Sequence, residues 1–311
     1  MFLFRFNFRL LFIIYFAVTG ISFVKADTLS FFAPAPSLNK KRVVLVTTTQ
    51  SALYGGSLIG LNELWYKNYP QSSFHFFNDN TEWFQMDKAG HVFSSYNVGF
   101  AGIELLKWSG VTRKKAIWYG GSVGFVYLGI IEVLDGFSSQ WGFSWGDFAA
   151  NTTGALMLVG QELVWKKQRI TLKYSFQPSI YTQYRPEALG NNFSQQLLKD
   201  YNGQTYWLSV NIASFIKKES KFPKWLNVAL GYGAEGMTGG YSNPVMYDGS
   251  GNQLLFERYR QFYLSLDVDL RNIKTKYPFV NTLFKTFGFI KFPAPSFEFN
   301  KHGVQGHWIG F

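Results

Sequence analysis

The 311 residues contain no cysteine, and they are poor in charge. The missing cysteine excludes disulfides, thiolate metal sites and a lipid-bearing anchor cysteine of the lipoprotein type. Charged residues make up only 16% of the chain, about two thirds of the usual quarter. Hydrophobic residues reach 47% and aromatic residues 20%. This balance predicts a protein that contacts lipid or a lipid–water boundary; a large, aromatic-rich soluble core is the alternative.

Acidic residues are also scarce relative to basic ones, 19 against 30, and the formal net charge is +11. In an exported protein this balance favours anionic membrane lipid or cell-wall polymer as the partner, and we expect no nucleic acid. The glycine pairs at Gly55, Gly120 and Gly239 form no phosphate loop or dinucleotide fingerprint. The four histidines lack zinc-helix spacing. We therefore expect no cofactor and no metal.

Residues 1–26 have the pattern of a targeting segment. Arg5 and Arg9 precede an apolar run from Leu10 to Val24, and Ala26 ends an acceptable small-residue cleavage site. We interpret the segment as a signal peptide, with an uncleaved anchor helix as the alternative. A leader that contains prolines follows at 27–42.

Four helical segments follow and predict a helical bundle over residues 43–168. They are Val43 to Tyr66, Asp87 to Trp108, Arg113 to Asp135, and Gly146 to Trp165. Each is long enough to run the length of a bundle or to cross most of a bilayer. Small residues such as Gly120, Gly121 and Gly124 allow close helix approach.

If these helices run up and down, their charges separate by end. The three basic clusters fall at one end: Lys40–Arg42, Arg113–Lys115 and Lys166–Arg169. Acidic residues predominate at the other end. The separation fits a polytopic inner-membrane bundle under the positive-inside rule, whereas the N-terminal pattern favours an exported protein, periplasmic or associated with the outer membrane. We favour export and a cell-envelope location.

The period changes from helical to alternating in residues 169–311. Four segments alternate apolar and polar residues, beginning near Ile170, Tyr206, Leu226 and Phe262. Two further short strands are expected at Ser296–Phe299 and Val304–Ile309, and an amphipathic helix between Pro278 and Phe289. The pattern predicts a small antiparallel sheet or half-barrel domain with one buried face, because closing a membrane barrel normally takes about eight strands. The predicted fold class is therefore α+β.

The residues most suited to chemistry lie at the acidic end of the predicted bundle. Antiparallel packing would bring His91, Glu132, Asp147 and Asn151 together. Burying four such groups unpaired costs several kcal/mol, so their convergence favours a site. The alternative is that these residues have structural roles only: His91 is a core histidine, and the aspartates cap helices, with Asp87 as one cap. The candidate catalytic residues are His91, Asp87, Lys88, Glu132, Asp147 and Asn151. A metal held by His91, Glu132 and Asp147 is a further alternative.

Candidate binding residues lie nearby and in a later loop. They are Asp135, Asp200, Tyr201, Asn202 and Arg185. Asp200 to Trp207 contains Asp-Tyr-Asn-Gly, which is turn chemistry. A tight turn that feeds the strand at Gln204 is therefore the alternative to a ligand loop.

These motifs resemble a known family. Asp87-Lys88-x-x-His91, then Glu132, then Asp147-x-x-x-Asn151-x-x-Gly154 is similar to the VanZ-like membrane proteins and to the YfiM-like predicted periplasmic proteins of unknown function. The resemblance covers about residues 43–165 and extends more loosely to about 240. It implies a four-helix bundle, an envelope location and possible dealings with glycopeptide or lipid-linked material. VanZ-like proteins lack the C-terminal sheet.

Two functions follow as hypotheses. The first is a membrane-associated envelope module that binds lipid or cell-wall material through the polar cluster. The second is a hydrolase or transferase that acts on a lipid-linked envelope substrate, with His91 and a carboxylate as the acid–base pair.

Overall fold

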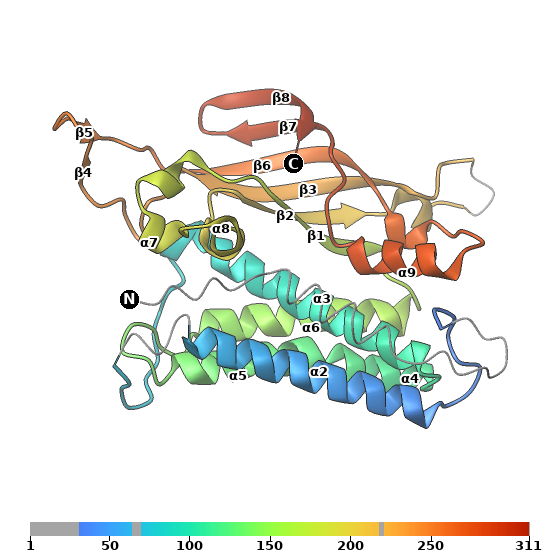
Figure 1. The fold of residues 1–311 in the computed structure, drawn as a ribbon. Coiled ribbons are helices and arrows are strands. Elements are labelled where there is room, and N and C mark those ends of the chain that lie inside the picture. Colours follow the sequence, from blue (N-terminus) through green and yellow to red (C-terminus); the bar gives the residue numbers. More distant parts are fainter. Residues whose placement is uncertain (1–30, 64–69, 218–220, 311) are drawn as a thin grey trace. The chain divides into compact units, whose positions relative to one another are not determined.

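The computed structural model describes residues 31–63, 70–217 and 221–310, and Phe32–Phe311 forms one compact unit. The predicted signal peptide at 1–26 lies outside the described residues, as do residues 27–30 of the predicted leader and the predicted end of the first helix at Tyr66. The architecture is α+β, a helical region followed by a six-stranded antiparallel sheet, as predicted (Figure 1).

The bundle helices lie close to their predicted positions. They are α2 (Lys40–Leu61), α3 (Met86–Trp108), α4 (Arg113–Lys115), α5 (Val123–Asp135) and α6 (Trp145–Val164). The predicted third helix is interrupted, because a π-helical turn at Ala116–Gly120 separates α4 from α5. Such turns arise where the regular hydrogen-bond ladder is disturbed, and here the turn ends at the paired glycines 120 and 121.

Glycines set the distance between the helices. A Cβ atom on Gly102 would come within 2.5 Å of the Gly120 carbonyl oxygen, and one on Gly99 within 2.7 Å of the Gly121 carbonyl oxygen. A Cβ atom on Gly124 would collide with the carbonyl oxygen of Ser95 in α3. The small residues therefore allow the backbones of α3 and the third helical segment to touch, as predicted.

Two glycines of α5 give a matched test of this packing. Gly124→Ala is expected to lower the free energy of unfolding by about 1–3 kcal/mol, because the new methyl group overpacks the α3–α5 contact. Gly129 has open space around it, so Gly129→Ala is expected to raise stability by up to about 1 kcal/mol through helix propensity. Urea unfolding of both variants checks the pair; equal effects would contradict the packing argument.

The basic clusters meet at one end of the bundle. Arg42, at the start of α2, donates a hydrogen bond of 3.1 Å from Nη1 to the Trp108 carbonyl oxygen at the end of α3. Arg113, at the start of α4, pairs at 3.0 Å with Glu162 near the end of α6. One segment of the described residues, Arg113–Asp135, is long and apolar enough to cross a membrane, by length and composition alone, and a third of its most apolar stretch is buried.

The sheet has the order β1-β2-β3-β6-β7-β8, with every neighbouring pair antiparallel. Its strands are β1 (Ile170–Phe176), β2 (Gln204–Val210), β3 (Leu226–Glu235), β6 (Tyr259–Val268), β7 (Ala294–Asn300) and β8 (Gly303–Gly310). A separate hairpin joins β4 (Met246–Tyr247) to β5 (Gln253–Leu254). The remaining helices are α7 (Pro186–Leu189), α8 (Phe193–Lys199) and the predicted amphipathic helix α9 (Pro278–Phe287).

The buried face of the sheet is its polar face. In β1 the alternation buries Thr171, Lys173 and Ser175 and leaves the apolar residues between them partly exposed. A sheet in water ordinarily buries its apolar set. Here the sheet curls until side chains of distant strands meet on its inner side: Lys173 Nζ of β1 lies 2.6 Å from Asp267 Oδ2 of β6. We call these the inner, polar face and the outer, apolar face.

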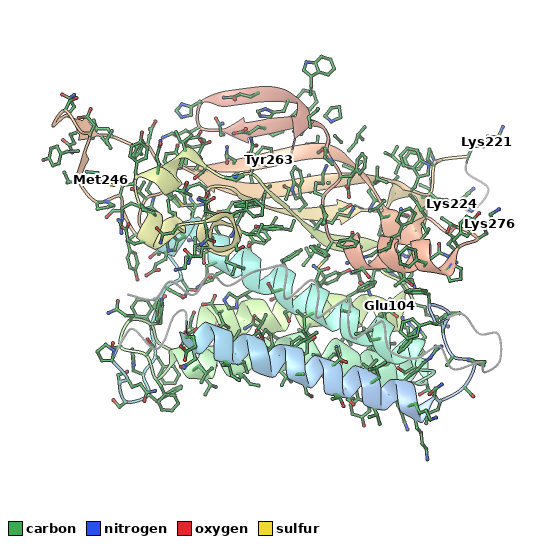
Figure 2. The ribbon with its side chains drawn as sticks, viewed as in Figure 1. Glu104, Lys221, Lys224, Met246, Tyr263 and Lys276 are labelled. Carbon is green, nitrogen blue, oxygen red and sulfur yellow. The ribbon has the colours of Figure 1, made fainter. Side chains whose placement is uncertain are left out.

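Helix α3 joins the bundle to the outer face of the sheet. The ring of Phe93 packs on those of Tyr174 and Tyr206, and Asn97 donates a 3.2 Å hydrogen bond to the Leu172 carbonyl oxygen. Lysines gather where β3 begins and β6 ends, among them Lys221, Lys224 and Lys276 (Figure 2).

Candidate functional site

The first turn of α3 presents Asp87, Lys88 and His91. Asp87 Oδ1 lies 3.7 Å from His91 Nε2, as expected for residues four apart on one helix face. The prediction that Asp87 caps the helix is wrong. The helix begins one residue earlier, after Gln85, and Gln85 has a left-handed backbone like Trp83 and Phe84 before it. Asp87 thus lies inside the first turn, and its carboxylate is free to meet other side chains.

The start of α6 supplies Asp147 and Asn151. Ser144 caps this helix by accepting a hydrogen bond from the Asp147 amide, which places Asp147 in the first turn and Asn151 one turn later. His91 Nδ1 lies 3.0 Å from Asn151 Oδ1. Because an amide oxygen only accepts, Nδ1 carries a proton and Nε2 faces Asp87 at 3.7 Å and Asp147 at 3.9 Å.

The end of α5 supplies Glu132. One of its oxygens, Oε1, lies 3.6 Å from His91 Nδ1 and has no hydrogen-bond partner among the residues that the structure describes. The other accepts a 3.4 Å hydrogen bond from the Ser144 amide. Burial raises the pKa of Glu132 to about 7, and the carboxylates of Asp135 and Asp87 add to this shift while His91 opposes it. Glu132 therefore holds a proton through much of the range up to neutral pH.

Lys88 is the cation at the centre of the cluster. Its Nζ atom lies 2.6 Å from Asp79 Oδ2, 2.9 Å from Asp147 Oδ1 and 3.3 Å from Asp87 Oδ2. Burial alone would lower the pKa of Lys88, but these carboxylates outweigh it and the pKa is raised. The ammonium group thus remains charged and is fully occupied by the protein's own acids.

The pKa values of the other groups in the cluster are shifted because several acids are buried close together. Burial raises the pKa of Asp147, and the charge of Asp87 adds to the shift. Asp79 is also buried, yet its bonds to Asp147, Lys88 and Ser144 lower its pKa. Burial by itself would lower the pKa of His91, but the carboxylates of Asp87, Asp147 and Glu132 outweigh it and raise the pKa. In this cluster, side chains that hold protons are therefore in direct contact with side chains that are ionised.

Two members of the cluster, Asp79 and Ser144, are not among the residues predicted from the sequence. Asp79 comes from the loop before α3 and reaches both Lys88 and the Ser144 hydroxyl, the latter at 2.6 Å. Ser144 was identifiable as the cap three residues before Asp147. Asp79 lies in an irregular segment, where no spacing rule predicts its partners.

The predicted binding residues divide into one that reaches the cluster and several that support loops. The Tyr201 hydroxyl donates a 2.9 Å hydrogen bond to Asp87 Oδ1. Asp200 instead accepts from the amide and hydroxyl of Ser179, and Asn202 bonds both the amide and the carbonyl oxygen of Met237. Arg185 bonds the Thr238 carbonyl oxygen and pairs with Glu187. Asp135 follows Glu132 by three residues at the end of α5.

A metal ion would compete with Lys88. Asp87, His91 and Asp147 offer ligand atoms within 4.8 Å of one another. However, the carboxylates of Asp87 and Asp147 both already face the Lys88 ammonium. A cation bound to this set would have to displace a charged side chain, so the residues fit a metal poorly.

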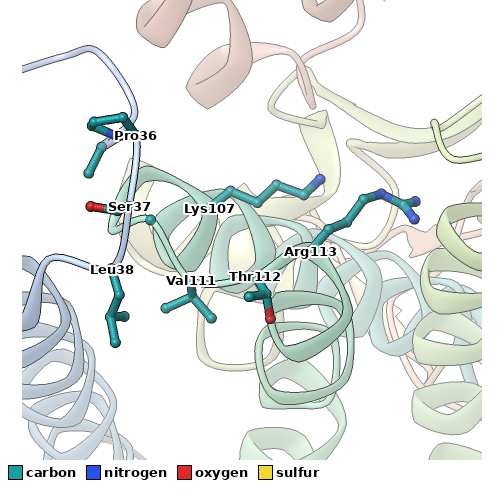
Figure 3. Close-up of a pocket in the computed structure, with 9 residues that line it drawn as sticks. Pro36, Ser37, Leu38, Lys107, Val111, Thr112 and Arg113 are labelled. Carbon is teal, nitrogen blue, oxygen red and sulfur yellow. The ribbon is translucent and has the colours of Figure 1, made fainter.

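A separate pocket of about 590 Å3 lies at the basic end of the bundle. Figure 3 shows Lys107 and Arg113 extending away from Ser37 and Leu38. Both cations reach Glu162, at 3.4 and 3.0 Å. Their charges are thus compensated within the protein, which does not favour this pocket as an anion site.

Residues 75–159 match the family model described as "Predicted periplasmic lipoprotein (DUF2279)". The match includes every member of the cluster except Tyr201, and it excludes the sheet. The family description confirms the predicted cell-envelope location, while the VanZ-like and YfiM-like names are not confirmed. The chain's 311 residues hold no cysteine that could carry the lipid. No curated protein and no solved structure matches the chain.

Proposed function

We propose that the polar cluster is the acid–base site of an envelope hydrolase or transferase that acts on a lipid-linked substrate. One observation carries the proposal: His91 is held on Asn151 through Nδ1, so that Nε2 faces the carboxylates of Asp87 and Asp147. Burial would lower the pKa of His91, but the carboxylates of Asp87, Asp147 and Glu132 raise it, which favours the form with a proton on Nε2. His91 is then the proton donor and Asp87 the proton acceptor.

Access to solvent favours this pair over the other acids. The side chains of Asp87 and His91 are 28% and 17% exposed, whereas those of Glu132 and Asp147 are 2% and 6% exposed. The buried pair is suited to a supporting role, because side chains with so little exposure are shielded from direct contact with a substrate. Asn151 is a positioning residue that fixes the ring of His91.

The resemblance to VanZ-like and YfiM-like proteins supports the substrate class. Four of its motif residues, Asp87, Glu132, Asp147 and Asn151, lie within 4 Å of the His91 ring nitrogens. That family's possible dealings with glycopeptide or lipid-linked material give the proposal its substrate. The proposed division into bundle (43–168) and sheet (169–311) places all of the motif in the bundle.

A second candidate function is binding without chemistry. The complete pairing of Lys88 favours it, because a module that only recognises lipid or cell-wall material needs a stable cluster and no titrating residue. Such a module would lose lipid or polymer association when the cluster or the basic clusters are altered. Its association would also rise at low salt, because screening of surface charge weakens there.

His91→Gln and Asp87→Asn are expected to abolish complementation of a deletion strain under envelope stress. Removal of one proton-transfer group typically costs about 10²- to 10⁴-fold in rate. His75→Gln is the control, since His75 lies outside the cluster and bonds Ser72 and Ser73. Protein level and melting temperature are measured in parallel. Full complementation by stable His91→Gln and Asp87→Asn proteins would refute the acid–base proposal and leave binding as the remaining function.

A further inference from the structure

The outer face of the sheet exposes apolar side chains over several adjacent strands. Cross-strand partners in β3, β6 and β7 share this face, as in the row Leu230, Leu264 and Phe297. Leu230 and Phe262 are 52% and 51% exposed, and Leu266 and Phe299 are exposed as well. The inner face meanwhile buries the Lys173–Asp267 pair. This inside-out distribution is the one found in sheets that face hydrocarbon.

An apolar groove of about 350 Å3 lies between α3 and this outer face. One turn of α3 forms its helical wall with Ala89, Val92 and Phe93, and the sheet contributes Leu208, Leu230 and Phe262. The volume falls within the range of about 300–1,000 Å3 usual for small-molecule sites. Because Leu230 and Phe262 are half exposed, the groove is continuous with the exposed apolar face.

The polar groups along the groove are already used by the protein. The Tyr206 hydroxyl donates a 2.8 Å hydrogen bond to Gln204 Oε1, and the Tyr232 hydroxyl donates to the Phe84 carbonyl oxygen. Lys173 turns its ammonium group to Asp267 on the inner face. A peptide in this groove would leave its backbone donors and acceptors unpaired, at a cost that a hydrocarbon chain does not incur.

The groove lies beside the polar cluster. Its helical wall begins at Ala89, which is two residues from both Asp87 and His91 and therefore projects from the other side of α3. The opposite wall includes Tyr206, whose hydroxyl is close enough to α3 that a Cβ atom on Gly90 would come within 2.8 Å of it. Burial raises the pKa of Tyr206, and the charge of Asp87 adds to this shift. The Tyr206 end of the groove is therefore its part nearest to the cluster, and a chain in the groove would direct its polar end there.

We infer that this groove binds one hydrocarbon chain of a membrane lipid. That this lipid is the substrate rests on the proposed function, which the inference deepens. The lipid part of the substrate is assigned to the groove residues Ala89, Val92, Phe93, Leu208, Leu230 and Phe262. The chain itself is recognised without any contribution from the proton chemistry of His91.

Photocrosslinking of the full-length protein tests the inference. The probe is a phospholipid with a diazirine in its acyl chain, incorporated into phosphatidylethanolamine–phosphatidylglycerol vesicles that carry the protein. Adducts are expected on the peptides that contain Val92–Phe93 and Leu208. Val92→Phe is expected to reduce the adduct yield on the Leu208 peptide about tenfold, because the larger ring occupies the chain's space. Ala89→Met, which places a flexible, unbranched side chain in the same wall, is the second variant should Val92→Phe fail to fold.

Val126→Phe provides the matched control, since Val126 is exposed on α5 away from the groove lining. Its adduct yield on the Leu208 peptide should equal that of the wild type. His91→Gln should also leave the yield unchanged, which separates the groove from the acid–base proposal. Adducts spread over exposed apolar residues without enrichment in the groove would overturn the inference. So would wild-type yield in both groove variants, or a groove occupied by residues 1–30 of the chain itself.

Discussion

Replacement of Lys173 by methionine is expected to lower the free energy of unfolding by about 3–5 kcal/mol. Lys173 Nζ and Asp267 Oδ2 lie 2.6 Å apart, and their side chains are 1% and 0% exposed. Methionine fills most of the space of lysine but removes the direct ion pair of the buried Asp267 carboxylate, which keeps hydrogen bonds from the Ser209 hydroxyl and the Phe292 amide and the more distant charge of Lys291. Chemical denaturation followed by circular dichroism measures the loss.

Two further variants separate charge burial from packing. Lys173→Met combined with Asp267→Asn should recover most of the loss, because asparagine removes the buried charge, accepts from the Phe292 amide through Oδ1 and donates to the Ser209 hydroxyl oxygen through Nδ2. Lys285→Met is the surface control: Lys285 pairs with Glu104 at 2.7 Å but is half exposed, so its loss should cost at most about 1 kcal/mol. If Lys173→Met and Lys285→Met were equally stable, the polar inner face would not be a dry core.

Stability is expected to fall as pH rises from about 4.5 to about 7, and Glu132→Gln should remove the share of that fall that is due to Glu132, while Asp147, whose pKa is also raised, keeps its own share. Burial raises the pKa of Glu132 from its ordinary 4.5 to about 7, so the folded state holds a proton that the unfolded state releases. A group of this kind stabilises the fold below its unfolded pKa, and the contribution is lost through the folded pKa. The pKa difference corresponds to about 3 kcal/mol. His91, whose pKa is also raised, changes stability in the same direction.

The measurement is the unfolding free energy of wild type and Glu132→Gln at a series of pH values. The two proteins should be similar near pH 5, where Glu132 is protonated and glutamine imitates it, and the variant should be the more stable near pH 8. Glu187→Gln is the control, because Glu187 is largely exposed and pairs with Arg185 outside the cluster. A wild-type curve that rises through this pH range would show that Glu132 is ionised in the folded protein.

The positions of most helices and strands could be predicted from the sequence. The 3.6-residue and two-residue periods place apolar side chains on one side of an element whatever its neighbours are, so local pattern alone locates α3, α6, β1 and β6. The convergence of His91, Glu132, Asp147 and Asn151 was also predictable in outline. Helices joined by short connections run antiparallel, and residues at their facing ends meet.

Other features depended on contacts between segments far apart in the chain. Asp79 joins the cluster from an irregular loop, Tyr201 reaches Asp87 from beyond the bundle, and the left-handed residues Trp83–Gln85 move the start of α3 one residue ahead of its expected cap. No local periodicity in the sequence predicts these contacts.

The sequence by itself therefore determined the order of elements, the apolar and polar faces of each, and the identity of the chemically capable residues. Only the tertiary structure decided which face of the sheet is buried. An alternating strand has two faces, and its pattern is the same whether its apolar set meets a core or an external hydrocarbon phase. The curl of the sheet, which brings Lys173 of β1 to Asp267 of β6, is a property of all six strands together, and it turns the polar face inward.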